Sequence, residues 1–120
     1  MAIGLNLNRQ GELTTLQNAA AGAANGTALD VTNAVGVVFE VSGTFTNLTV
    51  NWEGSVDGGS TYWSIGVAPL TTKTLATTAT ATGLYLFANV AGLTHARARI
   101  TAGAATGSIT VKAARTEVLA

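Results

Sequence analysis

The sequence predicts an all-β protein, an antiparallel β-sandwich or jelly-roll-like fold with an extended N-terminal arm. From Val35 onward, apolar and polar residues alternate in short runs, which is typical of strands with one buried face. Clusters of Gly, Asn, Asp and Ser separate these runs, at a spacing that suits about six or seven short antiparallel strands. A chain of 120 residues fits one domain. We therefore expect the arm over residues 1–34 and the sandwich over residues 35–120.

The arm lacks aromatic residues and is rich in Ala, Gly and Asn. A helix over 15–24 would place Leu13 and Leu16 on one face, but Gly22 within it costs about 1 kcal/mol relative to Ala. We interpret this part as extended chain. A short strand over 27–32 is expected near its end, because polar and apolar residues alternate there.

A hairpin signal lies between two alternating runs, 48–56 and 61–67. The residues between them, Asp-Gly-Gly-Ser over 57–60, tolerate the positive φ angles of a tight turn. Trp52 and Trp63 lie one in each run, and we expect both to anchor the core, because an aromatic side chain buries roughly 150–250 Å². The Thr/Ala tract that follows is either an exposed loop or an edge strand. Further strands are expected over 35–42, 84–90, 95–101 and 108–113, with turns over 91–92 and 103–107.

Composition excludes several classes of function. Six basic and six acidic residues give a formal net charge of zero, so a charge-driven nucleic-acid binder is not expected. Apolar residues make up 48% of the chain, too many for a disordered protein. There is no Cys, and polar residues interrupt the apolar start of the chain. We therefore expect no disulfide, no signal peptide and no membrane span.

Catalysis is not expected from the titratable residues. The sequence contains a single histidine, His95, and no Gly-x-Ser-x-Gly motif of a serine hydrolase. One His without any Cys is also too few ligands for a zinc site, so a surface or interface role is favoured for His95. Glu40 and Glu53 could share a face as a glycosidase pair does, but the alternation also fits two carboxylates that point outward independently. We predict no enzyme activity, no catalytic residue, no cofactor and no metal.

The basic residues near the C-terminus form the one concentration of charge, namely Arg97, Arg99, Lys112 and Arg115. Arg97 and Arg99 share one face of a strand, and Lys112 joins them if the last strand pairs with that strand. Two interpretations stay open: a basic strip that meets an acidic partner surface, or charges that protect a strand edge from aggregation.

Several segments together resemble small β-sandwich proteins of tailed-bacteriophage structural modules. They read Val-Phe-Glu-Val-Ser-Gly-Thr-Phe, Val-Asn-Trp-Glu-Gly-Ser-Val-Asp-Gly-Gly-Ser-Thr-Tyr-Trp, Gly-Leu-Tyr-Leu-Phe-Ala-Asn-Val-Ala-Gly-Leu, Ala-Arg-Ala-Arg-Ile and Gly-Ser-Ile-Thr-Val-Lys-Ala, and they begin at positions 38, 50, 83, 96 and 107. The resemblance implies a virion component: a capsid decoration (cement) protein, or else a head or tail accessory protein. It also implies synthesis in the host cytoplasm and a place on the capsid surface.

The same resemblance implies partners. We expect the major capsid protein or other virion proteins to be bound by a trimer or other cyclic homo-oligomer, whose avidity compensates for weak single contacts. The candidate interface combines the basic residues and His95 with the arm residues Leu5, Leu7 and Arg9. An alternative is a carbohydrate-binding module, for which Trp52, Tyr62 and Trp63 are the candidate aromatic platforms.

Overall fold

Every regular element that the structure describes is a β-strand, and all strand pairs are antiparallel, as predicted. The structure is a computed structural model, and it describes residues 8–10 and 13–118. The strands are β1 (Asn8–Gln10), β2 (Thr14–Ala20), β3 (Leu29–Asp30), β4 (Ala34–Ser55), β5 (Trp63–Ser64), β6 (Ala68–Pro69), β7 (Thr78–Ala79), β8 (Gly83–Phe87) and β9 (His95–Val118).

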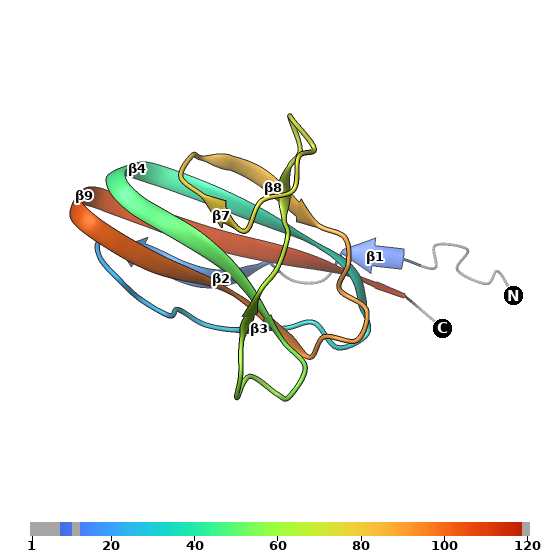
Figure 1. The fold of residues 1–120 in the computed structure, drawn as a ribbon. Helices are drawn as coiled ribbons and strands as arrows, with labels where there is room; N and C mark the ends of the chain where they lie inside the picture. Colours follow the sequence, from blue (N-terminus) through green and yellow to red (C-terminus); the bar gives the residue numbers. More distant parts are fainter. Residues whose placement is uncertain (1–7, 11–12, 119–120) are drawn as a thin grey trace, which may run out of the picture.

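Two long strands form the frame of the fold. β4 and β9 pair along their whole length, from Ala34 opposite Glu117 to Ser55 opposite His95. Figure 1 shows this two-stranded ribbon bending at one end and running back over itself. The sequence predicts separate strands before and after the bend. This prediction is wrong, because β4 and β9 both continue through it, with a register shift between Thr46 and Leu48. The predicted turn over 103–107 is the β9 side of the bend.

Glycine permits the bend. Gly43 and Gly107 have φ angles of +113° and +77°, which L side chains rarely adopt. A Cβ on Gly107 would lie 2.0 Å from the carbonyl oxygen of Thr44 on the facing strand, and a Cβ on Gly43 would lie 2.4 Å from the carbonyl oxygen of Ser108. The two strands therefore approach each other there more closely than any side chain allows.

The folded ribbon produces two layers. Layer I contains the first half of β4 and the second half of β9, with β8 and β6 on one side and β2 on the other. Layer II contains the second half of β4 and the first half of β9, with β5 and β7 on one side and β3 on the other. The inner faces of both layers form one core, which is the arrangement expected of a sandwich.

Aromatic rings join the layers. Phe39 from layer I lies against Trp52 from layer II with ring centroids 4.6 Å apart, and Tyr85 of β8 lies 5.4 Å from the same indole. Trp52 is 1% exposed, so its predicted place in the core is confirmed. The same prediction for Trp63 is wrong, because its side chain is 72% exposed. β5 is only two residues long, and Trp63 lies opposite Gly54 at the margin of layer II.

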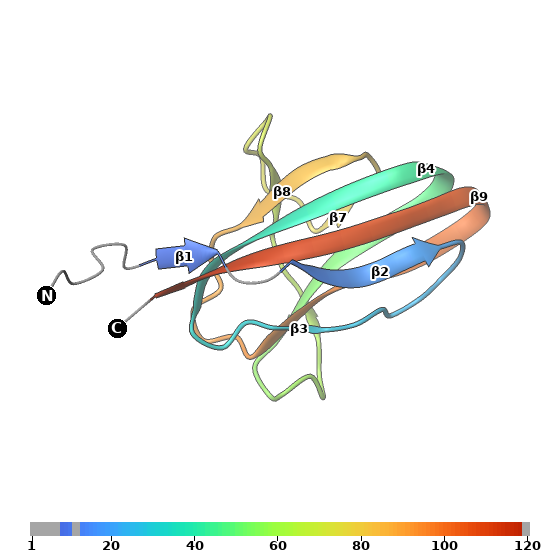
Figure 2. The ribbon, with the colours of Figure 1, turned by 180° about the vertical axis from the view of Figure 1, so that it is seen from behind.

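The segment from Thr14 to Val31 follows the outer edge of β9 from one layer to the other (Figure 2). Leu16, Leu29 and Val31 are buried in the core. The Nε2 of Gln17, a buried side chain, donates hydrogen bonds to the carbonyl oxygens of Ala24 (3.0 Å) and Ala98 (2.8 Å). The sequence predicts extended chain here, and the structure adds that this chain closes the edge of the sandwich.

Candidate interaction surface

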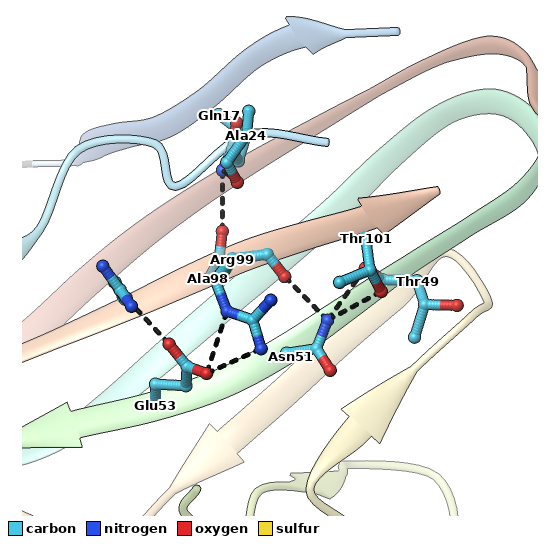
Figure 3. A network of polar contacts seen from close by, with 9 residues as sticks. Gln17, Ala24, Thr49, Asn51, Glu53, Ala98, Arg99 and Thr101 are labelled. Carbon is cyan, nitrogen blue, oxygen red and sulfur yellow. Dashed lines mark hydrogen bonds and ion pairs between the residues drawn. The ribbon is translucent and has the colours of Figure 1, made fainter. Parts of the chain in front are cut away.

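A charged network covers the outer face of layer II. Glu53 of β4 lies opposite Arg97 of β9, and the Nε of Arg97 donates a hydrogen bond of 2.8 Å to its Oε1. Arg99, two residues further along β9, donates a hydrogen bond of 3.0 Å from Nε to Oε2, and its Nη2 lies 2.9 Å from the same oxygen as an ion pair. Figure 3 shows Arg99 beside the Glu53 carboxylate, whose other oxygen pairs with Arg97. Glu53 is only 8% exposed, and the two ion pairs compensate for the burial of its charge.

Neighbouring polar groups fix the strands beneath this network. The Nδ2 of Asn51 donates to the carbonyl oxygen of Arg99 at 3.1 Å and to the Oγ1 of Thr101 at 3.0 Å (Figure 3). The guanidinium carbon of Arg97 lies 3.9 Å from the ring centroid of Tyr62, a cation–π contact. We call Asn51, Glu53, Tyr62, Arg97 and Arg99 the arginine face.

The loop that carries Tyr62 is built around one carboxylate. Oδ1 of Asp57 accepts hydrogen bonds from the Ser55 hydroxyl (2.7 Å) and from the backbone N–H groups of Thr61 (2.9 Å) and Ser60 (3.1 Å). The Ser55 hydroxyl and these backbone groups lower the pKa of Asp57 from 3.8 to about 2. Positive φ angles at Gly58 and Gly59 agree with the predicted turn. The loop therefore has a defined shape that positions Tyr62 over Arg97.

His95 lies at the start of β9, at the end of the arginine face. Its ring Nδ1 is 3.1 Å from the Oγ1 of Thr94, and its backbone lies opposite Asp30 of β3. The side chain is half-buried. Among the described residues, no group of three or more His, Cys, Asp and Glu side chains could hold a metal ion.

The outer face of layer I has a different character. Val38 lies between Leu86 and Ala114, and in the next row Glu40 lies between Leu84 and Lys112. We call Val38, Glu40, Leu84, Leu86 and Lys112 the leucine face. Leu84 and Leu86 are exposed. Beside them is a mainly apolar hollow of about 240 Å³, whose lining includes Leu70, Leu75 and Leu86 together with Lys73 and Asn89.

The expected basic strip is divided in the structure. Arg97 and Arg99 do share a face, but Lys112 lies in the other half of β9 and hence on the leucine face. The run over 108–113 does not pair with the run over 95–101, because both belong to one bent strand, β9. Arg115 pairs with Glu117 and donates a hydrogen bond of 2.7 Å to the carbonyl oxygen of Asp30.

The arm residues of the predicted interface fall mostly beyond what the structure covers. Leu5 and Leu7 lie outside the described residues. The backbone of Arg9 belongs to β1 and lies opposite Glu117. Glu40 and Glu53 do not form a carboxylate pair, because the bend places them on opposite outer faces.

Sequence reasoning missed the role of Glu53 in holding both arginines and the position of Tyr62 over Arg97. The alternation places Glu53 on an outer face, but only the pairing of β4 with β9 sets it opposite Arg97. A signal was present in the matched runs Asn-Trp-Glu-Gly over 51–54 and Ala-Arg-Ala-Arg over 96–99, which have the same period and opposite outward charges.

Two solved structures share this fold. The SPBc2 prophage-derived protein YomS superposes with a TM-score of 0.83 over 97% of this chain and 100% of its own, at 19% sequence identity. The PBSX exported protein XepA superposes with a TM-score of 0.82 over 98% of this chain and 44% of its own, also at 19% identity. This chain thus spans less than half the length of that XepA chain.

These features define the class of the fold, a small antiparallel β-sandwich that both solved structures share. The chain belongs to the XepA family, whose model matches residues 11–115. No curated protein matches it. The described part of the chain has no helix with the length and hydropathy needed to cross a membrane.

Proposed function

We propose that this protein is a non-enzymatic structural component of a phage particle that works by docking on other virion proteins. The arginine face is the observation that carries the proposal. Its side chains are held by one another and by the rigid loop before Tyr62, so that a partner meets a surface already in its binding geometry. Such preorganisation lowers the entropic cost of association.

The phage setting of this proposal is supported by the shared fold, because one of the two solved structures is that of a prophage-derived protein, YomS. Within that setting we assign the protein to capsid decoration, as a cement protein made in the host cytoplasm and bound to the major capsid protein on the capsid surface. We favour a trimer among the possible cyclic homo-oligomers. Such an oligomer would repeat the arginine face around its symmetry axis and thereby add avidity. A tail or neck accessory protein is the alternative within the same class.

The test is to locate the protein in a phage lysate. Particles are separated from free protein on a density gradient, heads are then separated from tails, and each fraction is analysed by quantitative mass spectrometry. The proposal expects the protein in the heads at a fixed ratio to the major capsid protein. Recovery with tails would favour the accessory role. Recovery only in the medium, free of particles, would contradict a virion role and would resemble the behaviour of XepA, which is described as an exported protein.

The copy number is measured separately on purified protein. Light scattering coupled to size-exclusion chromatography gives the mass of the assembly, to be compared with the 12.0 kDa of one chain. A multiple of that mass supports the oligomer, and a monomer at all concentrations contradicts it.

A carbohydrate-binding module remains a second candidate because of the exposed indole of Trp63. Exposed aromatic rings provide flat apolar platforms for ligands. Trp52 cannot serve in this way, since it is buried, and one face of Tyr62 is covered by Arg97. A glycan array with a Trp63→Ala variant as control tests this candidate.

A further inference from the structure

The arginine face carries more positive charge than its own carboxylate neutralises. Two guanidinium groups share the single carboxylate of Glu53, and no other carboxylate within residues 13–117 forms an ion pair with either of them. The remaining described acids are engaged or distant. Asp57 accepts hydrogen bonds in its own loop, and Asp30 accepts one from the backbone N–H of Thr32. Glu117 pairs with Arg115, and Glu40 lies on the leucine face. The network therefore has a net charge of about +1.

The hydrogen bonds leave specific donors unused. Arg97 contacts Glu53 through Nε, so neither of its Nη groups is needed to hold the carboxylate. Arg99 uses Nε and Nη2 on the same oxygen of Glu53, which leaves Nη1. The side chains of Arg97 and Arg99 are 21% and 33% exposed, so both reach solvent while their stems are fixed. Two N–H groups at the end of a planar guanidinium match the two oxygens of a carboxylate.

Tyr62 orients this donor pair. Its ring lies under the Arg97 guanidinium, and Asp57 fixes the loop that carries the ring. An arginine that is already stacked loses less side-chain entropy when it binds than a free one. Arginine and tyrosine are also among the residues that dominate binding energy at protein interfaces.

We propose that the arginine face binds a side-chain carboxylate of an acidic protein segment. The two Nη groups of Arg97 donate to the oxygens of this carboxylate, and Arg99 is the second donor. The inference rests on the proposed docking function and names the chemistry of its partner. One net positive charge suits one or two carboxylates. A nucleic-acid backbone would need a longer row of cations, and Lys112 and Arg115 are placed elsewhere.

The test is an NMR titration of the ¹⁵N-labelled full chain with a capped peptide, acetyl-Gly-Glu-Gly-Glu-Gly-amide, at low salt. The matched control peptide has Gln in place of Glu. We expect saturable shifts at the Nε–H signals of Arg97 and Arg99 with the Glu peptide only. Arg97→Gln should weaken binding by about tenfold, the loss of one charged hydrogen-bonding group. Lys112→Gln, on the leucine face, should leave the affinity within about twofold.

Two further arms keep the result interpretable. Arg97→Lys retains the charge beside Glu53 while removing the planar donor pair, so it should fold and still bind more weakly than the natural protein. Inorganic phosphate and a chitin tetrasaccharide are titrated in parallel. Equal shifts with both peptides, unchanged affinity in Arg97→Gln, tighter binding of phosphate, or shifts caused by the sugar alone would each overturn the proposal. None of these results depends on whether the protein is found in particles, so the proposed function fails or stands separately.

Discussion

The two outer faces of the sandwich differ although the same two strands build them. On the arginine face, nearly every polar group is held by another: Glu53 by two arginines, and Arg97 by Tyr62. On the leucine face, Glu40 and Lys112 lie opposite each other beside the exposed Leu84, and the described contacts include no ion pair between them. The inner faces show no such contrast, since both contribute to one core. Alternation thus accounts for the shared core, whereas the outward residues decide which face carries an ordered charged network.

The core shared by both faces should show the largest effect. Trp52→Ala removes the ring that joins the layers and should lower the free energy of unfolding by about 3–5 kcal/mol, as for other large-to-small core changes. Trp63→Ala is the matched control and should change it by less than about 0.5 kcal/mol, because that side chain is exposed. Urea unfolding of the two variants measures both values. Equal losses would refute the difference in burial.

The bend should show the next largest effect. Gly107→Ala combines a positive φ with a Cβ 2.0 Å from a carbonyl oxygen, and should cost about 2–4 kcal/mol. Gly58→Ala has a similar φ of +78° but nothing within 4 Å of the added Cβ, so only about 1 kcal/mol of backbone strain is expected. Thermal unfolding compares the two. If both cost the same, close approach at the bend does not constrain the fold.

The contrast between the faces is tested by two isosteric substitutions. Glu53→Gln removes the charge that two arginines hold, and should lower the free energy of unfolding by about 1–2 kcal/mol, less than for a fully buried pair because the arginines reach solvent. Glu40→Gln, on the leucine face, should change it by less than about 0.5 kcal/mol. Denaturant midpoints at low and high salt distinguish the two, and an equal effect would contradict the asymmetry.

The smallest effect concerns the loop before Tyr62 and depends on pH. The pKa of Asp57 is lowered from 3.8 to about 2 in the folded protein, so its ionised form stabilises the fold above pH 3.8, and this contribution disappears as the pH falls to about 2. Asp57→Asn should therefore be less stable than the natural protein at pH 6, and the gap should close near pH 2. Urea midpoints across this range measure the gap. A constant difference would show that the carboxylate charge is not responsible.

Much of the fold follows from local patterns in the sequence. The period of two predicts the buried residues Phe39, Trp52 and Ile100, because inward side chains alternate on any half-buried strand. The turn over 57–60 follows from its glycines. These features depend only on residues that are near in the chain.

The remaining features depend on pairing over long distances in the chain. Trp63 follows the same alternation as a core residue, yet its side chain is exposed, because β5 contains only two residues and lies at the margin of layer II. The continuity of β4 and β9 through the bend, and hence the separation of Lys112 from Arg97, follows from register that no local pattern specifies. Gln17 reads as a polar residue of an arm, and only its contacts across the edge of β9 explain its burial.

The proposed docking on a phage particle involves the arginine face. A cryo-electron microscopy reconstruction of the particle that carries the protein tests it most directly. We predict copies of the sandwich at symmetric positions, with Arg97 and Arg99 against an acidic segment of a neighbouring virion protein and the leucine face turned elsewhere. Copies attached through Leu84 and Leu86 with both arginines open to solvent, or particles with no sandwich on them, would contradict it.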